Sequence, residues 1–152
     1  MDTVTKDRQG SQQATDVAAA LERLFGLIRW LSPAGLSLTA AATLATLDRS
    51  GPGRLTALAA REGVTQPAMT QLIARMTEQG LVARVADPDD GRVVHVQLTD
   101  AGRDLVASRR AVRAGRLHAL LATLSADDRD ALTAALPAIN ALAGARRDEQ
   151  AR

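Results

Sequence analysis

The sequence predicts a mainly α fold with one small β-hairpin, its elements following the order α-α-α-α-β-β-α-α. Between residues 81 and 98, two Val-rich stretches alternate with polar residues, whereas apolar residues elsewhere recur with helical spacing. Hydrophobic residues make up 46% of the chain, yet Phe25 and Trp30 are its only aromatic residues. An interior built from Ala, Leu and Val favours close helix packing over a sheet-dominated fold.

The chain length of 152 residues fits one domain, or a small domain with an added oligomerisation region. No apolar run approaches the roughly 18 to 20 residues that span a bilayer, and the N-terminal segment lacks the apolar core of a signal peptide. The absence of cysteine excludes disulfides, thiolate zinc sites and thiol redox switches. We therefore expect a cytoplasmic protein that carries no cofactor.

The N-terminal part of the chain predicts a polar tail and two helices. Residues 1–13 are polar and are expected to be disordered. Over 14–31 the apolar residues follow helical spacing, at Val17, Leu21, Leu24, Leu27, Ile28 and Leu31. A Ser-Pro-Ala-Gly segment ends this helix, because Pro and Gly both oppose its continuation. Ser37 or Thr39 can cap a second helix that runs to about Leu47.

The next two helices predict a helix-turn-helix. Thr56 can cap a short helix over 57–62, which a glycine ends. Thr65 can cap the following helix, in which Pro67 occupies the first turn and forfeits no hydrogen bond. The inward face of this helix is apolar, with spacings of three and four, at Met69, Leu72, Ile73 and Met76. Gly80 is expected to end it.

A wing-like hairpin follows, with strands over 81–86 and 93–98 and an Asp-Pro-Asp-Asp-Gly turn between them. Asp90 and Arg92 lie two residues apart, so on an extended strand their side chains point to the same side. A carboxylate there can hold the guanidinium in one pose, and an arginine so held can enter a narrow minor groove. In isolation, the same pattern is more typical of an ordinary surface ion pair.

Two long helices are expected after the hairpin. Thr99 can cap one that runs to about Leu124, with Asp100 at the positive end of its dipole. Ser125 can start the last one, whose apolar residues are Leu132, Leu136, Ile139 and Leu142. Pro137 should kink this helix, because it removes a backbone hydrogen bond. The segment 146–152 is expected to fray.

The outward side of the second helix of the helix-turn-helix carries groups that can read DNA. These polar residues are Thr65, Gln66, Thr70, Gln71 and Arg75. Gln can pair with adenine and Arg with guanine, while Thr can hydrogen-bond or contact a thymine methyl group. Near the start of the helix, free N–H groups could equally hold a phosphate. The alternative is a solvated face of an amphipathic helix, which the neighbouring wing makes less favoured.

Overall charge does not decide the question. The pI of about 10.3 is typical of nucleic-acid-binding proteins, but 18 of the 19 basic residues are Arg in an Ala-rich chain, as a GC-rich genome would produce. From Leu38 to Thr99, six Arg are matched by six Asp and Glu. The placement of the charges must therefore decide whether the chain binds DNA.

Two sequence blocks, in the helix-turn-helix and around the hairpin, read LxxLAxREGVTQPAMTQLIARMTEQGLV and ADPDDGRVVHVQLTDAG. Together with the features from Leu38 to Thr99, they resemble the MarR family of transcriptional regulators. The second is similar to the family's wing signature of an Asp, one further residue and an Arg before a strand that ends in Leu-Thr. By position, the resemblance implies that Asp90 and Arg92 are the wing pair, with Arg92 in the minor groove.

The resemblance implies further DNA contacts outside the recognition helix. Arg54 and Thr56 fall near the start of the preceding helix, where the family contacts the DNA backbone, and Arg84 matches a basic position on the first wing strand. Gly91 departs from the family, in which many members carry a second basic residue at this place. A lower affinity of the wing for DNA follows from that departure.

The resemblance also implies a homodimer, because the terminal helices of the family interlock. The apolar stripes over 14–35 and 100–145 agree, since they lie outside the winged helix-turn-helix of 36–99 and need a partner surface. A two-fold dimer places two recognition helices about 34 Å apart on a pseudo-palindromic operator. We therefore expect a repressor that releases double-stranded DNA on binding a ligand. Pro137 departs from the family, because it interrupts a helix that the family uses for dimerisation. The packing of that helix in the dimer is therefore left open.

Many family members bind small aromatic or phenolic acids between the dimer helices and the winged helix. Trp30 falls near that region, although a lone Trp on an apolar face is more typical of a core residue. His95 and His118 lack partners at metal-ligand spacing and are interpreted as structural. The five arginines of the long helix (Arg103, Arg109, Arg110, Arg113 and Arg116) are interpreted as a solvated face with some pairing in the dimer, and a DNA-backbone contact by Arg103 is the less favoured alternative.

Two other functional classes compete with a DNA-binding regulator. A winged helix that binds a protein instead of DNA would explain the neutral charge of the central segment. An enzyme is disfavoured, because the carboxylates of Asp87, Asp89 and Asp90 lie on a turn with no His, Cys or phosphate-binding loop to complete a site.

Overall fold

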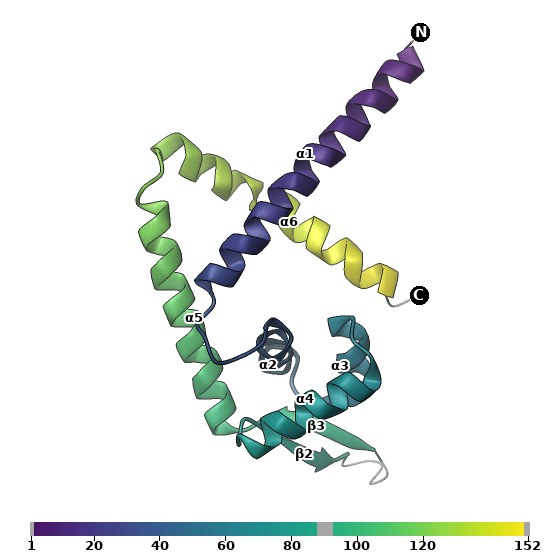
Figure 1. Ribbon diagram of the computed structural model, residues 1–152, viewed down its shortest axis with the longest axis vertical. Helices are drawn as coiled ribbons and strands as arrows, with labels where there is room; N and C mark the ends of the chain where they lie inside the picture. Colours follow the sequence, from purple (N-terminus) through teal and green to yellow (C-terminus); the bar gives the residue numbers. More distant parts are fainter. Residues whose placement is uncertain (1, 88–92, 151–152) are drawn as a thin grey trace.

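The computed structural model describes residues 2–87 and 93–150 of the chain (Figure 1). The elements in chain order are α1 (Asp2–Leu31), α2 (Leu38–Ser50), β1 (Gly53–Arg54), α3 (Leu55–Glu62), α4 (Gln66–Glu78), β2 (Val82–Ala86), β3 (Val94–Leu98), α5 (Asp100–Leu121) and α6 (Ala126–Gln150). Figure 1 shows α2, α3, α4 and the strands gathered at one end of the molecule, while α5 extends away from them and α1 projects to the far end. The predicted class, a helical protein with a small wing, is confirmed.

The hydrophobic core lies between the helix-turn-helix and the sheet. Its most deeply buried side chains come from α2, α4, β2 and β3, at Leu44, Met69, Ile73, Met76, Val82 and Val96. The predicted inward face of α4 is therefore correct, because Met69, Leu72, Ile73 and Met76 are all buried. Burying this face leaves the opposite side of α4 in solvent.

Three of the expected helix caps are present, at the starts of α2, α4 and α5. The hydroxyl oxygens of Ser37, Thr65 and Thr99 accept hydrogen bonds from backbone N–H groups three residues later, at 3.1, 3.3 and 3.0 Å. The cap expected at Thr56 is wrong, because α3 already begins at Leu55 and its N-cap position is Arg54. The helix starts earlier because it follows β1 directly.

The sheet has the strand order β1-β3-β2, and both pairings are antiparallel. Within the wing, Arg84 lies opposite Val96 and Val85 lies opposite His95. The sequence did not predict β1, in which Gly53 pairs with Val96 and Arg54 with His95. A two-residue strand after a Gly-Pro-Gly segment has no alternating pattern, so only its pairing with β3 defines it.

The chain ends also differ from expectation. The sequence predicted disorder over 1–13, but α1 is helical from Asp2. Polar side chains do not oppose a helix when they pair along it, as Gln12 does with Asp16 at 3.1 Å. At the other end α6 continues through Pro137 to Gln150, where fraying was expected from residue 146. The long helix α5 ends at Leu121, three residues before the predicted end.

Candidate nucleic-acid interface

The outward face of α4 presents free polar groups to solvent. Gln66, Gln71 and Arg75 are exposed, and among the described residues none of their side chains has a hydrogen-bond or ion-pair partner. Their donors and acceptors are therefore available to a ligand. These residues face outward because the apolar positions of α4, three and four apart, are buried in the core.

The two threonines of this face are partly committed to the helix itself. Thr65 uses its hydroxyl oxygen to accept the N–H of Ala68, so its hydroxyl proton stays free to donate. Thr70 does the reverse, because its hydroxyl donates to the carbonyl oxygen of Gln66 at 2.8 Å. Thr70 can therefore accept a hydrogen bond or offer its methyl group, while Thr65 can donate to a phosphate oxygen.

A hollow of about 430 Å³ lies between the start of α4 and the wing. We call it the helix–wing hollow, and its lining residues are Leu55, Gln66, Thr70, Arg84, Val85, Ala86, Val94 and Val96. It brings together three of the predicted site residues, Gln66, Thr70 and Arg84, from α4 and β2. Arg75 lies elsewhere, on a hollow that α4 forms with the start of α2 around Gly35 and Ser37. Gln66 and Arg75 thus lie on opposite sides of α4.

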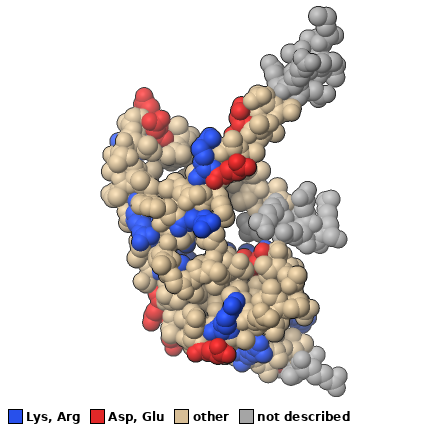
Figure 2. All heavy atoms as spheres, viewed as in Figure 1, with Lys and Arg blue, Asp and Glu red and all other residues tan. Residues whose placement is uncertain are grey.

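Some charged side chains around α4 and the wing have partners within the fold, and others do not. Arg54, Arg75 and Arg84 are exposed and have no carboxylate partner among the described residues. Two nearby acids are engaged, since Asp48 pairs with Arg110 at 3.0 Å and Glu62 accepts a hydrogen bond from Thr46 at 3.1 Å. Figure 2 shows basic side chains scattered among acidic ones on the visible face, in keeping with the neutral count. Three unpaired arginines nevertheless surround the helix-turn-helix and the wing.

The wing pair predicted at Asp90 and Arg92 lies outside the described residues. The structure does describe the two residues on either side of the wing turn, where Asp87 donates its N–H to the carbonyl oxygen of Val93 at 2.8 Å. Asp87 also lies 3.3 Å from the Nε2 atom of His95. His95 therefore joins β3 to the residue that follows β2. Among the described residues no cluster of metal-ligating side chains forms.

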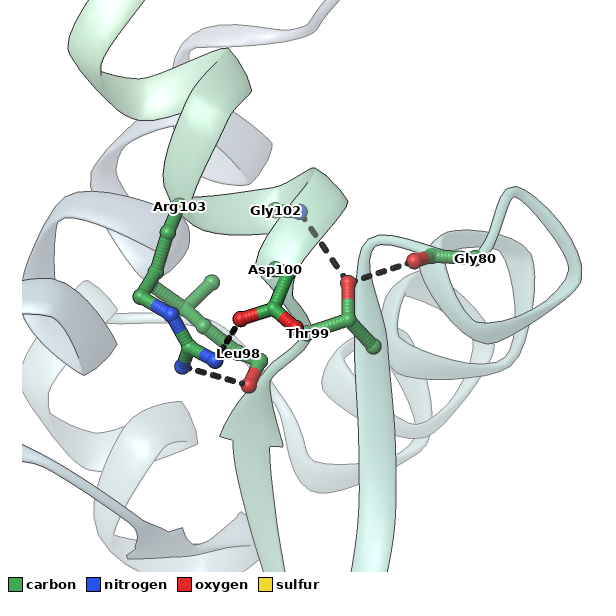
Figure 3. Close-up of polar contacts among 6 residues, drawn as sticks. All are labelled: Gly80, Leu98, Thr99, Asp100, Gly102 and Arg103. Carbon is green, nitrogen blue, oxygen red and sulfur yellow. Dashed lines mark hydrogen bonds and ion pairs between the residues drawn. The ribbon is translucent and has the colours of Figure 1, made fainter.

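Thr99 joins the end of β3 to the turn after α4 and to the first turn of α5. Its hydroxyl accepts the N–H of Gly102 and donates to the carbonyl oxygen of Gly80 at 2.6 Å, as Figure 3 shows. Beside it, Arg103 donates to the carbonyl oxygen of Leu98 at 3.0 Å and pairs with Asp100. The guanidinium of Arg103 is thus engaged within the fold, which disfavours the DNA-backbone contact considered for it.

The arginines of α5 do not all lie on a solvated face. Arg109 is buried and donates to the carbonyl oxygens of Pro33 and Ala34, at 2.8 and 3.0 Å. Burial lowers its pKa, and the neighbouring Arg113 lowers it further. One helical turn beyond Arg113, Arg116 donates to the carbonyl oxygen of Trp30 at 3.1 Å. No sequence pattern signals these contacts, because their acceptors are backbone carbonyls.

Trp30 is not a core residue of this chain, contrary to the favoured interpretation. Its side chain is 59% exposed at the end of α1. The carbonyl group of Trp30 is fixed by Arg116, while the indole ring stays in solvent. No helix in the described part of the chain is long and apolar enough to cross a membrane.

Comparison with known proteins gives a consistent result. The family model described as MarR family matches residues 36–94. An HTH-type transcriptional regulator of Mycobacterium tuberculosis is 38% identical over 130 residues, which cover 85% of this chain and 91% of that protein. An HTH-type transcriptional repressor of the same species is 37% identical over 97 residues, covering 63% of this chain and 69% of that protein.

A solved structure agrees in fold over most of the chain. The crystal structure of RV1404 from Mycobacterium tuberculosis superposes with a TM-score of 0.70 and 25% sequence identity, covering 83% of this chain and 89% of that one. The sequence match, the helix-turn-helix and the three-stranded sheet with its wing all indicate a DNA-binding transcriptional regulator, and the enzyme alternative is set aside. The chain belongs to the MarR family of winged helix-turn-helix transcriptional regulators.

Proposed function

We propose that this chain is a homodimeric repressor of a pseudo-palindromic operator, with α4 in the major groove and the wing in the minor groove. The observation that carries the proposal is the outward face of α4, where Gln66, Gln71 and Arg75 have no partner among the described residues. A helix held by its apolar side, with free amide and guanidinium groups on the other, fits the geometry of major-groove reading.

The contacts divide by position. Gln71 lies on the outermost side of α4, away from both flanking hollows, and would reach base edges. Gln66 and Arg75 flank the helix and would contact the two DNA strands beside the groove. Arg84 across the helix–wing hollow and Arg54 with Thr56 at the start of α3 would bind phosphates, as would the free hydroxyl proton of Thr65. Asp90 and Arg92 complete the proposal as the wing pair.

Exposed apolar side chains support the dimer. Besides Trp30, the exposed large apolar residues of α1 and α6 are Val17, Leu21, Leu24, Phe25, Ile28, Leu132, Leu136, Ile139 and Leu142. They recur with spacings of three and four, so each helix carries an apolar stripe that the described part of the chain leaves uncovered. Contiguous exposed apolar surface of this kind marks a protein–protein contact. A second copy of the chain would bury it, and would place the two α4 helices on one face of the duplex.

The ligand of the proposed repressor would be a small organic acid. A hollow of about 100 Å³ between α2 and α5 is lined by Arg49, Arg109, Arg110 and Arg113. Arg109 is committed to backbone carbonyls and Arg110 to Asp48, which leaves Arg49 and Arg113 for an anion. The hollow has room for an acid group but not for a whole ring, so the ring of an aromatic acid would lie outside it. The exposed indole of Trp30 is the proposed partner for such a ring.

A mobility-shift experiment tests the DNA-binding proposal. Duplexes selected from a random pool should be two half-sites with two-fold symmetry, bound by one dimer. Gln71→Ala should weaken binding of the selected duplex, whereas Gln79→Ala, at the C-cap of α4 and beyond the reading face, should not. Equal binding by both variants would contradict the role of α4, and recovery of no duplex at all would favour the protein-interaction alternative.

The ligand proposal has a separate test. Benzoate is a suitable probe, and benzamide is its uncharged counterpart of the same shape. Benzoate should release the selected duplex at concentrations at which benzamide does not, and Arg113→Ala should remove the difference. Equal effects of the two compounds would contradict an anion site.

A further inference from the structure

The turn after α4, the proposed recognition helix, and the start of α5 meet at a junction made by Gly80, Leu81, Thr99 and Gly102. Thr99 hydrogen-bonds to the other three residues. Its hydroxyl donates to the Gly80 carbonyl oxygen and accepts the Gly102 N–H, at 2.6 and 3.0 Å. Its own N–H donates to the carbonyl oxygen of Leu81 at 3.1 Å. Figure 3 shows the Thr99 hydroxyl between Gly80 and Gly102. One side chain thus fastens the turn after α4 to the first turn of α5.

Gly102 lets the two segments approach to contact distance. It is buried in the first turn of α5, and a Cβ atom placed on it would lie only 2.1 Å from the carbonyl oxygen of Leu81. Contacts shorter than 3.0 Å do not occur for real Cβ atoms, so any side chain here would push the segments about 0.9 Å apart. Glycine is a poor helix former, so its presence inside a helix needs another reason. The close approach of Leu81 supplies that reason.

The junction lies between the part of the chain that reads DNA and the part that would form the dimer. The N-terminal half of α4 carries Gln66, Thr70 and Gln71, and α4 is 13 residues long, which corresponds to about 20 Å. In the other direction, α5 leads from the junction to α6 and packs against α1 (Figure 1). These two helices carry the exposed apolar stripes. A displacement at the junction therefore changes where the reading end of α4 lies relative to the dimer axis.

We infer that Thr99 and Gly102 are positioning residues that set the separation of the two recognition helices, and with it the half-site spacing that the protein selects. The inference rests on the proposed dimer on two half-sites. Neither residue needs to touch DNA, because both act through the angle between α4 and α5. Half-site spacing is a geometric property of a dimeric reader, so it reports this angle directly.

The experiment compares operators that share the same half-sites but differ in spacer length by single base pairs. The wild-type dimer should bind one spacer best, and at least about tenfold more tightly than its neighbours. Gly102→Ala and Thr99→Val should shift the preferred spacer or reduce that ratio to below about threefold. Thr99→Ser keeps both hydrogen bonds of the hydroxyl and should keep the wild-type preference.

Gly115→Ala is the matched control. Gly115 lies on the same helix, but nothing approaches within 4 Å of a Cβ atom placed on it, so its variant should keep the wild-type spacer preference. A variant that is merely less stable loses active protein equally for all operators, which leaves the ratio between spacers unchanged. An unchanged ratio in both Gly102→Ala and Thr99→Val would therefore overturn the inference, and Thr99→Val provides the test if Gly102→Ala does not fold. A wild-type chain that binds DNA without any preferred spacer would instead contradict the dimeric function itself.

Discussion

The guanidinium of Arg109 donates a 2.8 Å hydrogen bond to the carbonyl oxygen of Pro33, 76 residues earlier in the chain. With a second bond to Ala34, it fastens the connection between α1 and α2 to the middle of α5. No carboxylate pairs with this buried arginine among the described residues. The two backbone carbonyl groups after α1 therefore compensate for the cost of burying its charge. The orientation of α1, and of its apolar face, depends on this contact.

Arg109→Ala should therefore destabilise the protein. Hydrogen bonds that involve a charged donor contribute about 1.5 to 3 kcal/mol, and the burial that lowers the pKa of Arg109 offsets part of that gain. We expect the free energy of unfolding in urea to fall by about 1 to 2 kcal/mol. Arg116→Ala, whose side chain is more exposed, should cost less. A larger destabilisation by Arg116→Ala than by Arg109→Ala would contradict the structural role of Arg109.

The ion pair of Arg110 with Asp48 should contribute little to stability. Its atoms lie 3.0 Å apart, but the side chains are 64% and 27% exposed, so water and salt screen the attraction. A double-mutant cycle with Arg110→Ala and Asp48→Ala should give a coupling energy of about 0 to 1 kcal/mol, which falls as salt is added. A coupling above about 2 kcal/mol, or one that salt does not reduce, would show a stronger structural role than the exposure implies.

Thr65 is predicted to act first as a helix cap. Thr65→Ala removes the acceptor for the Ala68 N–H and should lower the free energy of unfolding by about 0.5 to 2 kcal/mol, while Thr65→Ser should keep most of it. Thermal unfolding followed by circular dichroism measures the difference. If Thr65→Ser destabilised the protein as much as Thr65→Ala, the methyl group rather than the hydroxyl would be the important part.

The unpaired arginines should determine how steeply DNA binding falls with salt. Removing one phosphate-binding group reduces the slope of log K against log salt by about 0.9, so Arg84→Ala should lower the slope by about that amount, and Arg54→Ala likewise. Arg61 donates to the hydroxyl of Ser50 and serves as the control, since Arg61→Ala should leave the slope unchanged. Titration of one selected duplex at several salt concentrations gives all three slopes. Identical slopes for Arg61→Ala and Arg84→Ala would contradict the claim that only the unpaired arginines bind phosphates.

The sequence predicted α4 well because its boundaries follow from local chemistry. A capping Thr65, Pro67 in the first turn and apolar residues three and four apart specify both the start of the helix and the side that it buries. The same local rules failed at β1, whose two residues become a strand only by pairing with β3. They also failed at Thr56, where that pairing moved the helix start to Leu55.

The sequence named candidate site residues, but it could not give their arrangement around α4. Nothing in the sequence separates the flank of Gln66, beside the wing, from that of Arg75, beside α2. The burial of Arg109 was missed for a different reason. Its partners are carbonyl groups, which every residue carries, so no pattern of side chains could reveal them.

The most direct test of the central claim, that the outward face of α4 reads base sequence, is the binding of wild-type protein and Gln71→Ala to a set of operators with single base-pair changes. The wild-type protein should lose about 1 to 3 kcal/mol of binding free energy at the base pair that Gln71 contacts, and Gln71→Ala should bind all four base pairs at that place nearly equally. Discrimination at the other positions should be kept in the variant. If Gln71→Ala weakens binding to every operator by the same factor and keeps the full wild-type discrimination, Gln71 does not read sequence and the claim fails.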